Sequence, residues 1–327
     1  MKLTLTQNRI IRLLFLKGSL SRKSLASALS LSKAALTFAT KEMLEEGLLV
    51  SVGEKENEGK AGRREEMLQL NPGYGCLLGL DIRLHNFYFS LTDFQGANPS
   101  FLVAKTEKEA TRILESIQKK GPIIAFSILM RGEASLEKLR ERFPSFAKAL
   151  AVLPCPFSIQ NNVAALARIY AFYHEENQNF LLVKYGPGLG SAIYVNGNLL
   201  GSSSELGHAY VGNRPLEEQI SFSSLLGEEL EEKEGAERLL SNEALLTEAM
   251  GKLSYGLYNA TELLHLEKIV LSGALLSHEF PRKLLSDGLE SIDREANLPE
   301  IIHYPSYDSI NEIKGSISAF LLFSSLE

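Results

Sequence analysis

Basic side chains gather in the first 64 residues of the chain, and their chemistry is that of phosphate binding. These residues hold 12 Lys or Arg against 6 Asp or Glu, whereas the rest of the chain holds 22 against 34. Because an acidic protein repels polyanions, a basic segment on one indicates a polyanionic partner. The alternative is a local excess of charge on a solvated face. Lys60, Arg63 and Arg64 stand in a glycine-rich loop at 59–64, a composition suited to phosphates or to a narrow minor groove.

Three short helices are predicted ahead of that loop. Residues 7–17 repeat apolar side chains at helical spacing, and Ser21 precedes a second helix. A turn at 30–32 leads into a third helix over 33–46, with Ser32 as its N-cap. The apolar side chains predicted to face the core of this segment are Ile10, Ile11, Leu13, Leu14, Leu16, Leu25, Ala26, Leu29, Leu36, Met43 and Leu44.

A tight turn before the third of three helices is typical of a helix-turn-helix, whose third helix enters the major groove of DNA. Strand-like stretches at 48–52 and 66–70 flank the basic loop and complete a wing. We therefore predict a winged helix-turn-helix domain over residues 1–72. The outer face of the third helix and the loop supply the residues predicted to contact DNA, which are Ser32, Lys33, Thr37, Phe38, Lys41, Lys60, Arg63 and Arg64.

Base recognition by the third helix is expected to depend on few polar groups. Residues 33–41 contain no Arg, Asn or Gln, the side chains that usually read bases with two hydrogen bonds. Specificity is therefore expected to come from Thr37, Lys33, Lys41 and the wing. The alternative for the whole segment is a helical interaction domain that binds no DNA.

Length and composition bound the class of protein. At 327 residues, two or three domains are expected. No apolar run is long enough to span a membrane and no secretory leader is evident, so we expect a cytoplasmic protein with no membrane partner. Two cysteines, Cys76 and Cys155, are too few for a disulfide scaffold or a four-ligand zinc site. An acidic run at 228–237 is interpreted as a solvated helix face.

Alternating strands and helices follow a turn-rich linker at 71–75. Two strand-rich openings, each followed by helices, indicate two α/β lobes, with boundaries at 73–175 and 176–327. The predicted strands lie at 76–82, 86–93, 123–129, 157–160, 179–185, 191–195 and 268–272, and the predicted helices at about 106–120, 135–150, 162–173 and 312–325.

Five motifs follow one another along the chain. The wing end at 62–71 leads into Leu78-Gly79-Leu80-Asp81-Ile82. The other four are Gln160-Asn161-Asn162-Val163-Ala164-Ala165-Leu166, Gly186-Pro187-Gly188-Leu189-Gly190, Glu205-Leu206-Gly207-His208 and Ile269-Val270-Leu271-Ser272-Gly273. In this order they resemble the ROK family of winged-helix repressors and sugar kinases. The resemblance implies a winged helix-turn-helix followed by a two-lobed body with the actin-like ATPase fold.

Departures from the kinases of that family argue against catalysis. Asn162 stands where those kinases carry an aspartate that takes the proton of the sugar hydroxyl, and an amide cannot act as that base. Their first phosphate loop is Asp-x-Gly-Gly-Thr, whereas residues 81–85 contain no glycine. Pro187 replaces a threonine of the second loop and removes both a hydroxyl and an N–H. We expect no catalytic residues and no enzyme activity. The alternative is a divergent ATP-dependent sugar kinase.

A structural zinc ion is not expected. In relatives, the histidine matching His208 is followed by a Cys-x-Cys-Gly-x-x-Gly-Cys run whose thiolates bind zinc. The stretch at 209–218 contains no cysteine, so His208 would lack its partners. We interpret His208 as a hydrogen-bonding residue, and we expect neither a metal nor a cofactor.

A sugar-binding site is implied by the same resemblance. Amide and carboxylate side chains suit a polyol because they offer directed donors and acceptors. In relatives a further glutamate binds the sugar, and it matches either Glu217 or Glu218, because a gap in the comparison makes the position ambiguous. The alternative is a vestigial site that serves only the structure. The implied sugar-binding residues are Asn161, Asn162, Glu205, His208, Glu217 and Glu218.

The sequence therefore predicts a transcription regulator, expected to be a repressor, whose inactive kinase-like body dimerises and senses a carbohydrate. The expected partners are operator DNA, a sugar or sugar phosphate, and a second copy in a homodimer or a dimer of dimers. Dimers place two recognition helices about one helical turn apart on a pseudo-palindromic site. Besides the kinase, a protein scaffold is the remaining alternative.

Overall fold

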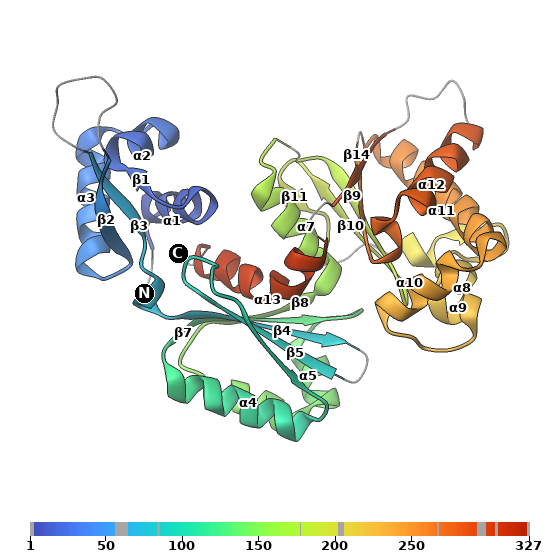
Figure 1. Ribbon diagram of the computed structural model, residues 1–327, viewed down its shortest axis with the longest axis horizontal. Coiled ribbons are helices and arrows are strands. Elements are labelled where there is room, and N and C mark those ends of the chain that lie inside the picture. The colour runs from blue at the N-terminus through green and yellow to red at the C-terminus, as the bar shows by residue number, and fades with distance from the viewer. Residues whose placement is uncertain are drawn as a thin grey trace. The chain divides into compact units, whose positions relative to one another are not determined.

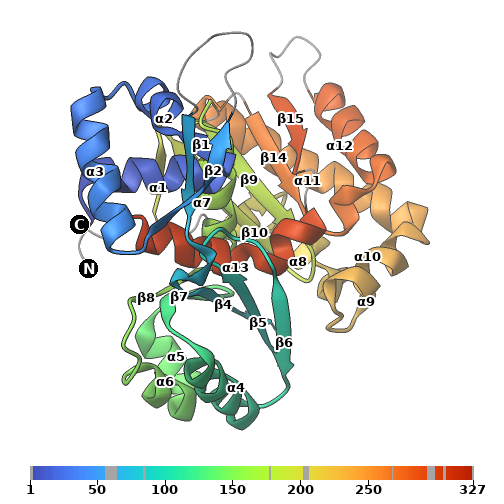
Figure 2. The same cartoon turned by 60° about the vertical axis from the view of Figure 1, so that its left-hand side comes forward.

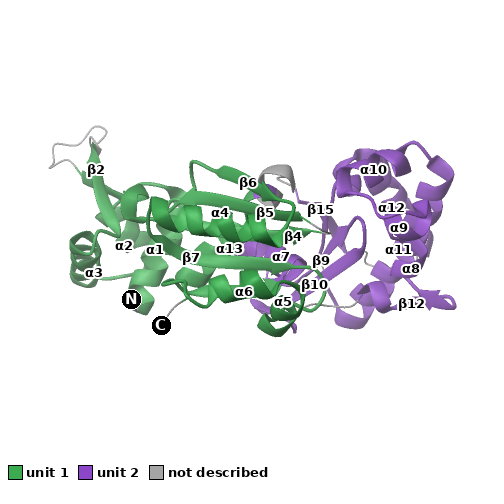
Figure 3. Cartoon of the chain, turned by 90° about the horizontal axis from the view of Figure 1, so that it is seen from below, with its two compact units in different colours: residues 1–160, 313–327 green, residues 161–312 purple. Residues whose placement is uncertain are grey.

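The computed structural model describes residues 3–55, 65–83, 86–176, 178–201, 206–266, 268–292, 299–304 and 307–325 (Figure 1). The chain forms two compact units, residues 1–160 with 313–327 and residues 161–312 (Figure 3). The three-domain division stays a prediction, and the observed units differ from it in two places. Helix α7 (Asn162–Tyr173) lies in the second unit, and the C-terminal helix from Ile313 onward lies in the first.

The N-terminal part of the first unit is a winged helix-turn-helix in form, with three helices and a three-stranded sheet in the order β1-β3-β2. Side-chain caps start all three helices, and Thr4 and Gln7 form a capping box at the first. Ile10, Leu25 and Met43 are fully buried between the helices. The elements are α1 (Leu5–Lys17), β1 (Leu20–Ser21), α2 (Arg22–Leu29), α3 (Lys33–Glu45), β2 (Leu49–Lys55) and β3 (Glu65–Leu70).

A five-stranded mixed sheet in the order β6-β5-β4-β7-β8 forms the rest of the first unit. The first three strands pair antiparallel, and β7 runs parallel to β4. Ala110, Leu114 and Phe146 pack against one face of this sheet. Its elements are η1 (Pro72–Tyr74), β4 (Cys76–Arg83), β5 (Asn86–Asp93), β6 (Ser100–Ala104), α4 (Glu107–Lys120), β7 (Ile123–Met130), α5 (Leu136–Arg142), α6 (Pro144–Leu150), β8 (Phe157–Asn161) and α13 (Tyr307–Phe323).

The prediction of one helix over 135–150 is wrong. The chain forms two short helices that meet at Phe143, where φ is −139° and ψ is 68°. A proline disfavours helical backbone in the residue before it, so Pro144 ends one helix and begins the next.

The second unit repeats the strand order of the first. Its sheet runs β11-β10-β9-β14-β15, so both sheets have the sequential order third, second, first, fourth, fifth. In both, the second strand pairs antiparallel with the first and the fourth pairs parallel with it. The remaining elements are β9 (Phe180–Tyr185), β10 (Leu189–Val195), β11 (Asn198–Leu199), η2 (Leu206–His208), β12 (Tyr210–Val211), β13 (Arg214–Pro215), α8 (Glu217–Ile220), α9 (Phe222–Leu226), α10 (Glu232–Leu240), α11 (Glu243–Leu264), β14 (Lys268–Ser272), η3 (Leu275–Ser277), α12 (Glu279–Ile292) and β15 (Glu300–His303).

Alternate side chains of β9 enter two different cores, as expected for a strand covered on both faces. Leu181 and Val183 pack with the apolar side chains of α10, α11 and α12, whereas Phe180 and Leu182 pack with those of α7. This doubled topology confirms the predicted α/β fold with two actin-like lobes. Among the described helices, none is long and apolar enough to cross a membrane.

Helix α13 links the winged-helix segment to the sheet of the first unit (Figure 2). A Cβ atom added to Gly79 of β4 would lie 2.3 Å from the backbone of Gly315, so the helix and the strand touch backbone to backbone. Five residues further on, the ring of Phe320 stacks on Phe15 of α1, with centroids 3.7 Å apart. A single helix therefore contacts both the sheet and the first helix of the winged segment.

Candidate functional site

The turn between α2 and α3 has the geometry of a helix-turn-helix. Ser30 adopts a left-handed conformation, with φ of 53°, and ends α2. Ser32 then begins α3 by accepting a hydrogen bond from the Ala35 amide at 3.2 Å. The Ser32 hydroxyl is thus engaged in capping, and as an exposed group at a helix N-terminus it lies where phosphate contacts are commonly made.

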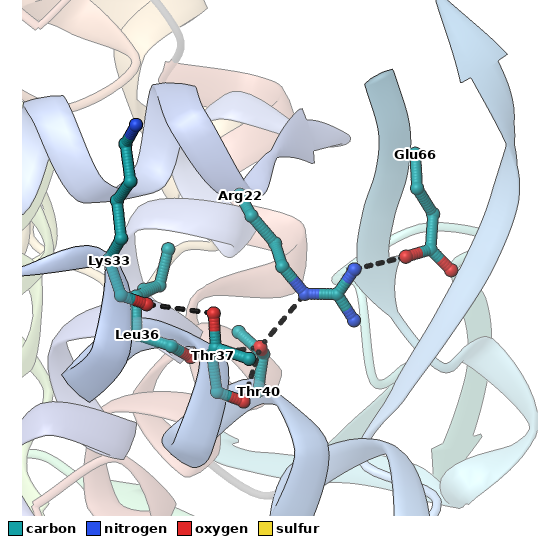
Figure 4. Close-up of polar contacts among 6 residues, drawn as sticks. All are labelled: Arg22, Lys33, Leu36, Thr37, Thr40 and Glu66. Atoms are coloured by element: carbon teal, nitrogen blue, oxygen red, sulfur yellow. Dashed lines mark hydrogen bonds and ion pairs between the residues drawn. The ribbon is translucent and has the colours of Figure 1, made fainter. Parts of the chain in front are cut away.

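The outer face of α3 carries the side chains that the sequence predicted there. Lys33, Thr37, Phe38 and Lys41 are exposed, whereas Leu36 is buried. The Thr37 hydroxyl donates to the Lys33 carbonyl at 2.7 Å, which leaves the lone pairs of its oxygen as acceptors (Figure 4). Lys41 lies 3.7 Å from the Glu45 carboxylate, but both side chains are largely exposed, so this pair is weak. The Phe38 ring is 66% exposed, a large apolar surface for a residue in a solvated helix.

Arg22 ties α2, α3 and the wing strand together, a role that sequence reasoning missed. Its Nε donates to the Thr40 hydroxyl at 3.2 Å, and its guanidinium pairs with the Glu66 carboxylate of β3 (Figure 4). Next to it, Lys23 lies 3.5 Å from Glu65 of the same strand. Forty-four residues separate Arg22 from Glu66, so no local spacing pointed to the pair. The contacts fix the direction of α3 relative to β3.

The tip of the wing lies outside the described residues, and with it Lys60, Arg63 and Arg64. The flanking strands β2 and β3 pair antiparallel, and their last described pair is Lys55 with Glu65. The predicted hairpin is therefore present, while the DNA contacts of its loop stay a prediction.

In the second unit, Asn161 and Asn162 lie at the start of α7. Asn161 Oδ1 accepts hydrogen bonds from the amides of Val163 and Ala164, at 2.8 and 3.1 Å, so it is the N-cap of the helix. Both asparagines are half-buried. Val163 packs against the start of β10, where a Cβ atom on Gly190 would lie 2.5 Å from its side chain.

Glu217 reaches the same strand from the other direction. Its Oε1 accepts a hydrogen bond from the Leu189 amide at 3.2 Å, and its Oε2 would lie 3.0 Å from a Cβ atom on Gly207. Glu218 is exposed, and so is His208 on η2. The structure thus brings Glu217 to the glycine loop and the Gly207-His208 segment. Val163 of α7, next to the two asparagines, packs on Gly190, the neighbouring residue of β10. Glu205 lies outside the described residues.

A buried lysine and a half-buried arginine contact Asp81 of β4, another feature that the sequence did not reveal. Asp81 is 5% exposed, and its Oδ2 lies 2.7 Å from Lys314 Nζ and 2.5 Å from Arg83 Nε. Lys314 belongs to α13 and is itself only 2% exposed. Two cations therefore neutralise the carboxylate, and one of them is almost completely buried.

The interpretation of the 228–237 run as a solvated face is wrong for one of its members. Glu228 and Glu234 are about half exposed and pair with Arg238, as expected of a solvated face. The Glu232 side chain is 15% exposed and lies 3.0 Å from Lys184 Nζ.

Within the described ranges, no group of three or more His, Cys, Asp or Glu side chains is placed to hold a metal ion.

No family model matches the chain. It is 21% identical over 224 residues to the xylose repressor of Staphylococcus xylosus, a match that covers 62% of this chain and 58% of that protein. The chain therefore aligns with less than two thirds of that relative's length.

Solved structures share the fold at low sequence identity. A ROK family transcriptional regulator, a homologue of the E. coli MLC protein, matches with a TM-score of 0.71 and 16% identity over 98% of both chains. The ROK hexokinase from Thermus thermophilus matches with a TM-score of 0.57 and 16% identity, over 76% of this chain and 99% of the hexokinase. The ordered motifs, the doubled sheet and these similarities show that the chain shares the fold of ROK family proteins.

Proposed function

We propose that this chain is a DNA-binding transcriptional repressor whose kinase-like body senses a carbohydrate without phosphorylating it. The observation that carries the proposal is the face of α3, where Lys33, Thr37, Phe38 and Lys41 are exposed beside a wing held by Arg22. Such a face, following a helix-turn-helix, is what the major groove of DNA accepts. The xylose repressor name of the relative agrees with this reading.

The wing supplies the second half of the DNA-binding proposal. Lys60, Arg63 and Arg64 extend the basic surface beyond the described strands. Each phosphate that a Lys or Arg neutralises releases counterions, so affinity should fall steeply as salt rises. We also propose that the protein is cytoplasmic and forms a homodimer. The two copies together would present two such faces to one operator.

A sugar is the proposed effector, and Glu217 is the described residue best placed to bind it. Its carboxylate reaches both the glycine loop and the Gly207-His208 segment, whereas Glu218 is exposed. A carboxylate accepts hydrogen bonds from adjacent hydroxyls, which suits a polyol. Glu205 and His208 complete the proposed set, together with Asn161 and Asn162. The relative's name makes xylose the first sugar to test.

The absence of kinase activity is part of the proposal. Asn162 offers no base, and Asp81 is neutralised by Lys314 and Arg83 where a kinase loop would keep its acid available. The carboxylate would have to lose two close cations before it could serve a metal-bound phosphate.

Selection of binding sites from a random duplex library tests the DNA half directly. We expect recovery of a pseudo-palindromic site, tight binding to it, and loss of that binding in Lys33→Ala. Lys120→Ala, which removes an exposed lysine from α4, is the matched control and should bind normally. If no sequence is enriched over the starting library, the chain is not a repressor.

Two further measurements test the body. Incubation with ATP and common pentoses and hexoses should yield no sugar phosphate, and turnover of about 1–100 per second would identify a kinase. Calorimetry with xylose and other sugars should show binding that Glu217→Ala weakens by about 1.5–3 kcal/mol, the range for a hydrogen bond to a charged group. If no sugar binds at millimolar concentration, the site is vestigial, while the DNA result stands by itself.

A further inference from the structure

The Glu232 carboxylate lies where two parallel strands of the second unit end. Its Oε2 lies 3.0 Å from Nζ of Lys184, the penultimate residue of β9. Its Oε1 accepts a hydrogen bond at 3.0 Å from the amide of Ala274, two residues after β14. β9 and β14 are adjacent and parallel, so both contacts lie at the carboxyl edge of the sheet. Ligands of α/β sheets bind at that edge.

The groups around this carboxylate are those that proteins use for small oxyanions. A lysine ammonium and a backbone N–H both donate to it. Gly186 lies beside it, and a Cβ atom there would sit 3.3 Å from Glu232 Cγ, so a side chain would crowd the carboxylate. Gly273, before Ala274, has φ of 125°, and a Cβ atom there would lie 2.1 Å from the Tyr185 carbonyl oxygen. Only glycine permits this turn, and the turn carries the Ala274 amide.

A further polar group lies next to the lysine. Ser272 pairs in register with Lys184, and paired residues of parallel strands present their side chains on the same face. Its hydroxyl is buried and has no hydrogen-bond partner within the described part of the chain. Buried hydroxyls normally have a hydrogen-bond partner, so the Ser272 hydroxyl is available to donate a hydrogen bond to an anion bound beside it.

We propose that Lys184, the Ala274 amide and the Gly186 turn form a site for a small oxyanion, phosphate or pyrophosphate, and that Glu232 fills it as an internal ligand. The carboxylate supplies the negative charge that a bound phosphate would otherwise bring to Lys184. While it is in place, the second unit admits no phosphate ligand at this edge of the sheet. The proposal uses no part of the DNA-binding surface and does not depend on it.

Removing the internal carboxylate tests the proposal by rescue. In Glu232→Ala, Lys184 loses the carboxylate 3.0 Å away, and an added oxyanion should replace it. We expect about 10 mM pyrophosphate to raise the midpoint of thermal unfolding of Glu232→Ala by about 2 °C or more, compared with a sodium chloride solution of the same ionic strength. The wild-type protein should show no such rise.

Two variants make the result specific. Glu234→Ala removes a neighbouring, exposed carboxylate of the same helix and should behave as wild type. Lys184→Met combined with Glu232→Ala should abolish the rescue, because the cation is gone. If Glu232→Ala does not fold, Glu232→Gln removes the charge while keeping the shape, and it should show the same response to pyrophosphate. The proposal is overturned if neither variant responds, or if the double variant responds equally.

Discussion

Lys314 Nζ lies 2.7 Å from Asp81 Oδ2, and both side chains are almost completely buried. The first residue comes from the last helix of the chain and the second from the first strand of the body sheet. In unit 1 the same helix brings Gly315 against Gly79, so the ion pair and the backbone contact occur at neighbouring positions. The charge of Asp81 therefore serves to dock α13.

Asp81→Asn should strongly destabilise the first unit, because it removes the charge with which the buried lysine is paired. Breaking a buried pair from one side costs about 3–5 kcal/mol. Asp81→Asn combined with Lys314→Met should regain part of that loss, since no buried ammonium remains. Urea unfolding followed by circular dichroism measures both. Lys252→Met, which breaks the exposed pair with Glu248, is the control and should change little. If Asp81→Asn is as stable as the wild-type protein, the Asp81 charge does not dock α13.

Gly79→Ala should also release α13, by sterics and not by charge. The added Cβ atom would meet the Gly315 backbone at 2.3 to 2.4 Å, and a helix backbone cannot yield as a flexible side chain can. Overpacking of this kind costs about 1–3 kcal/mol or more.

Gly251→Ala offers a contrast in α11, because its Cβ atom would meet nothing within 4 Å. That variant should gain about 0.5–1 kcal/mol from helix propensity. Thermal melts that rank the two variants in the opposite order would exclude the close approach.

Phe38 should recognise thymine methyl groups in the operator. Its exposed ring lies on the same turn as Thr37, and residues 33–41 contain no Arg, Asn or Gln, so apolar contact with thymine methyl groups would add to the few polar contacts of α3. Replacing a contacted thymine by deoxyuridine removes only the methyl group. Fluorescence anisotropy should show a loss of about 0.8 kcal/mol, or about fourfold, for each such position.

Phe38→Ala provides the control for that experiment. It should bind the thymine and deoxyuridine sites with equal, reduced affinity, because the ring that contacts the methyl group is gone. If Phe38→Ala still discriminates between the two sites, a different residue reads the methyl group.

The Cys155 thiol should resist labelling at neutral pH. Burial, with a smaller contribution from Cys76, raises the pKa of Cys155 to about 11 from an ordinary value of 9.0. The stability that follows is fully present below pH 9, where the unfolded thiol is protonated, and is lost as pH rises towards 11. Reaction with a disulfide reagent at pH 8 should therefore be slow until urea unfolds the chain. Cys155→Ala should show a flatter decline of stability above pH 9, and an equal decline would contradict the shift.

Local chemistry in the sequence determined most of the elements of this protein. Ser21, Ser32 and Asn161 cap the helices α2, α3 and α7 by accepting hydrogen bonds from amides two or three residues further on. Because these contacts are local, the starts of the three helices could be predicted closely. Apolar periodicity likewise indicated β14 over its observed range. The strand Ser100–Ala104 was not predicted, because four of its five residues are exposed and it shows no alternation of burial.

Tertiary structure alone decided which charges meet. Lys314 and Asp81 lie at opposite ends of the body sequence, and Glu232 and Lys184 belong to different elements of the second unit. An acidic run looks the same in sequence whether its members are solvated or paired, so Glu232 could not be separated from Glu234. The fold also separates Glu217 from Glu218, because it directs the Glu217 carboxylate to the Leu189 amide and leaves Glu218 exposed. Each of these contacts depends on where the chain returns after a strand or helix, and that is set by the packing of the sheets and not by spacing along the chain.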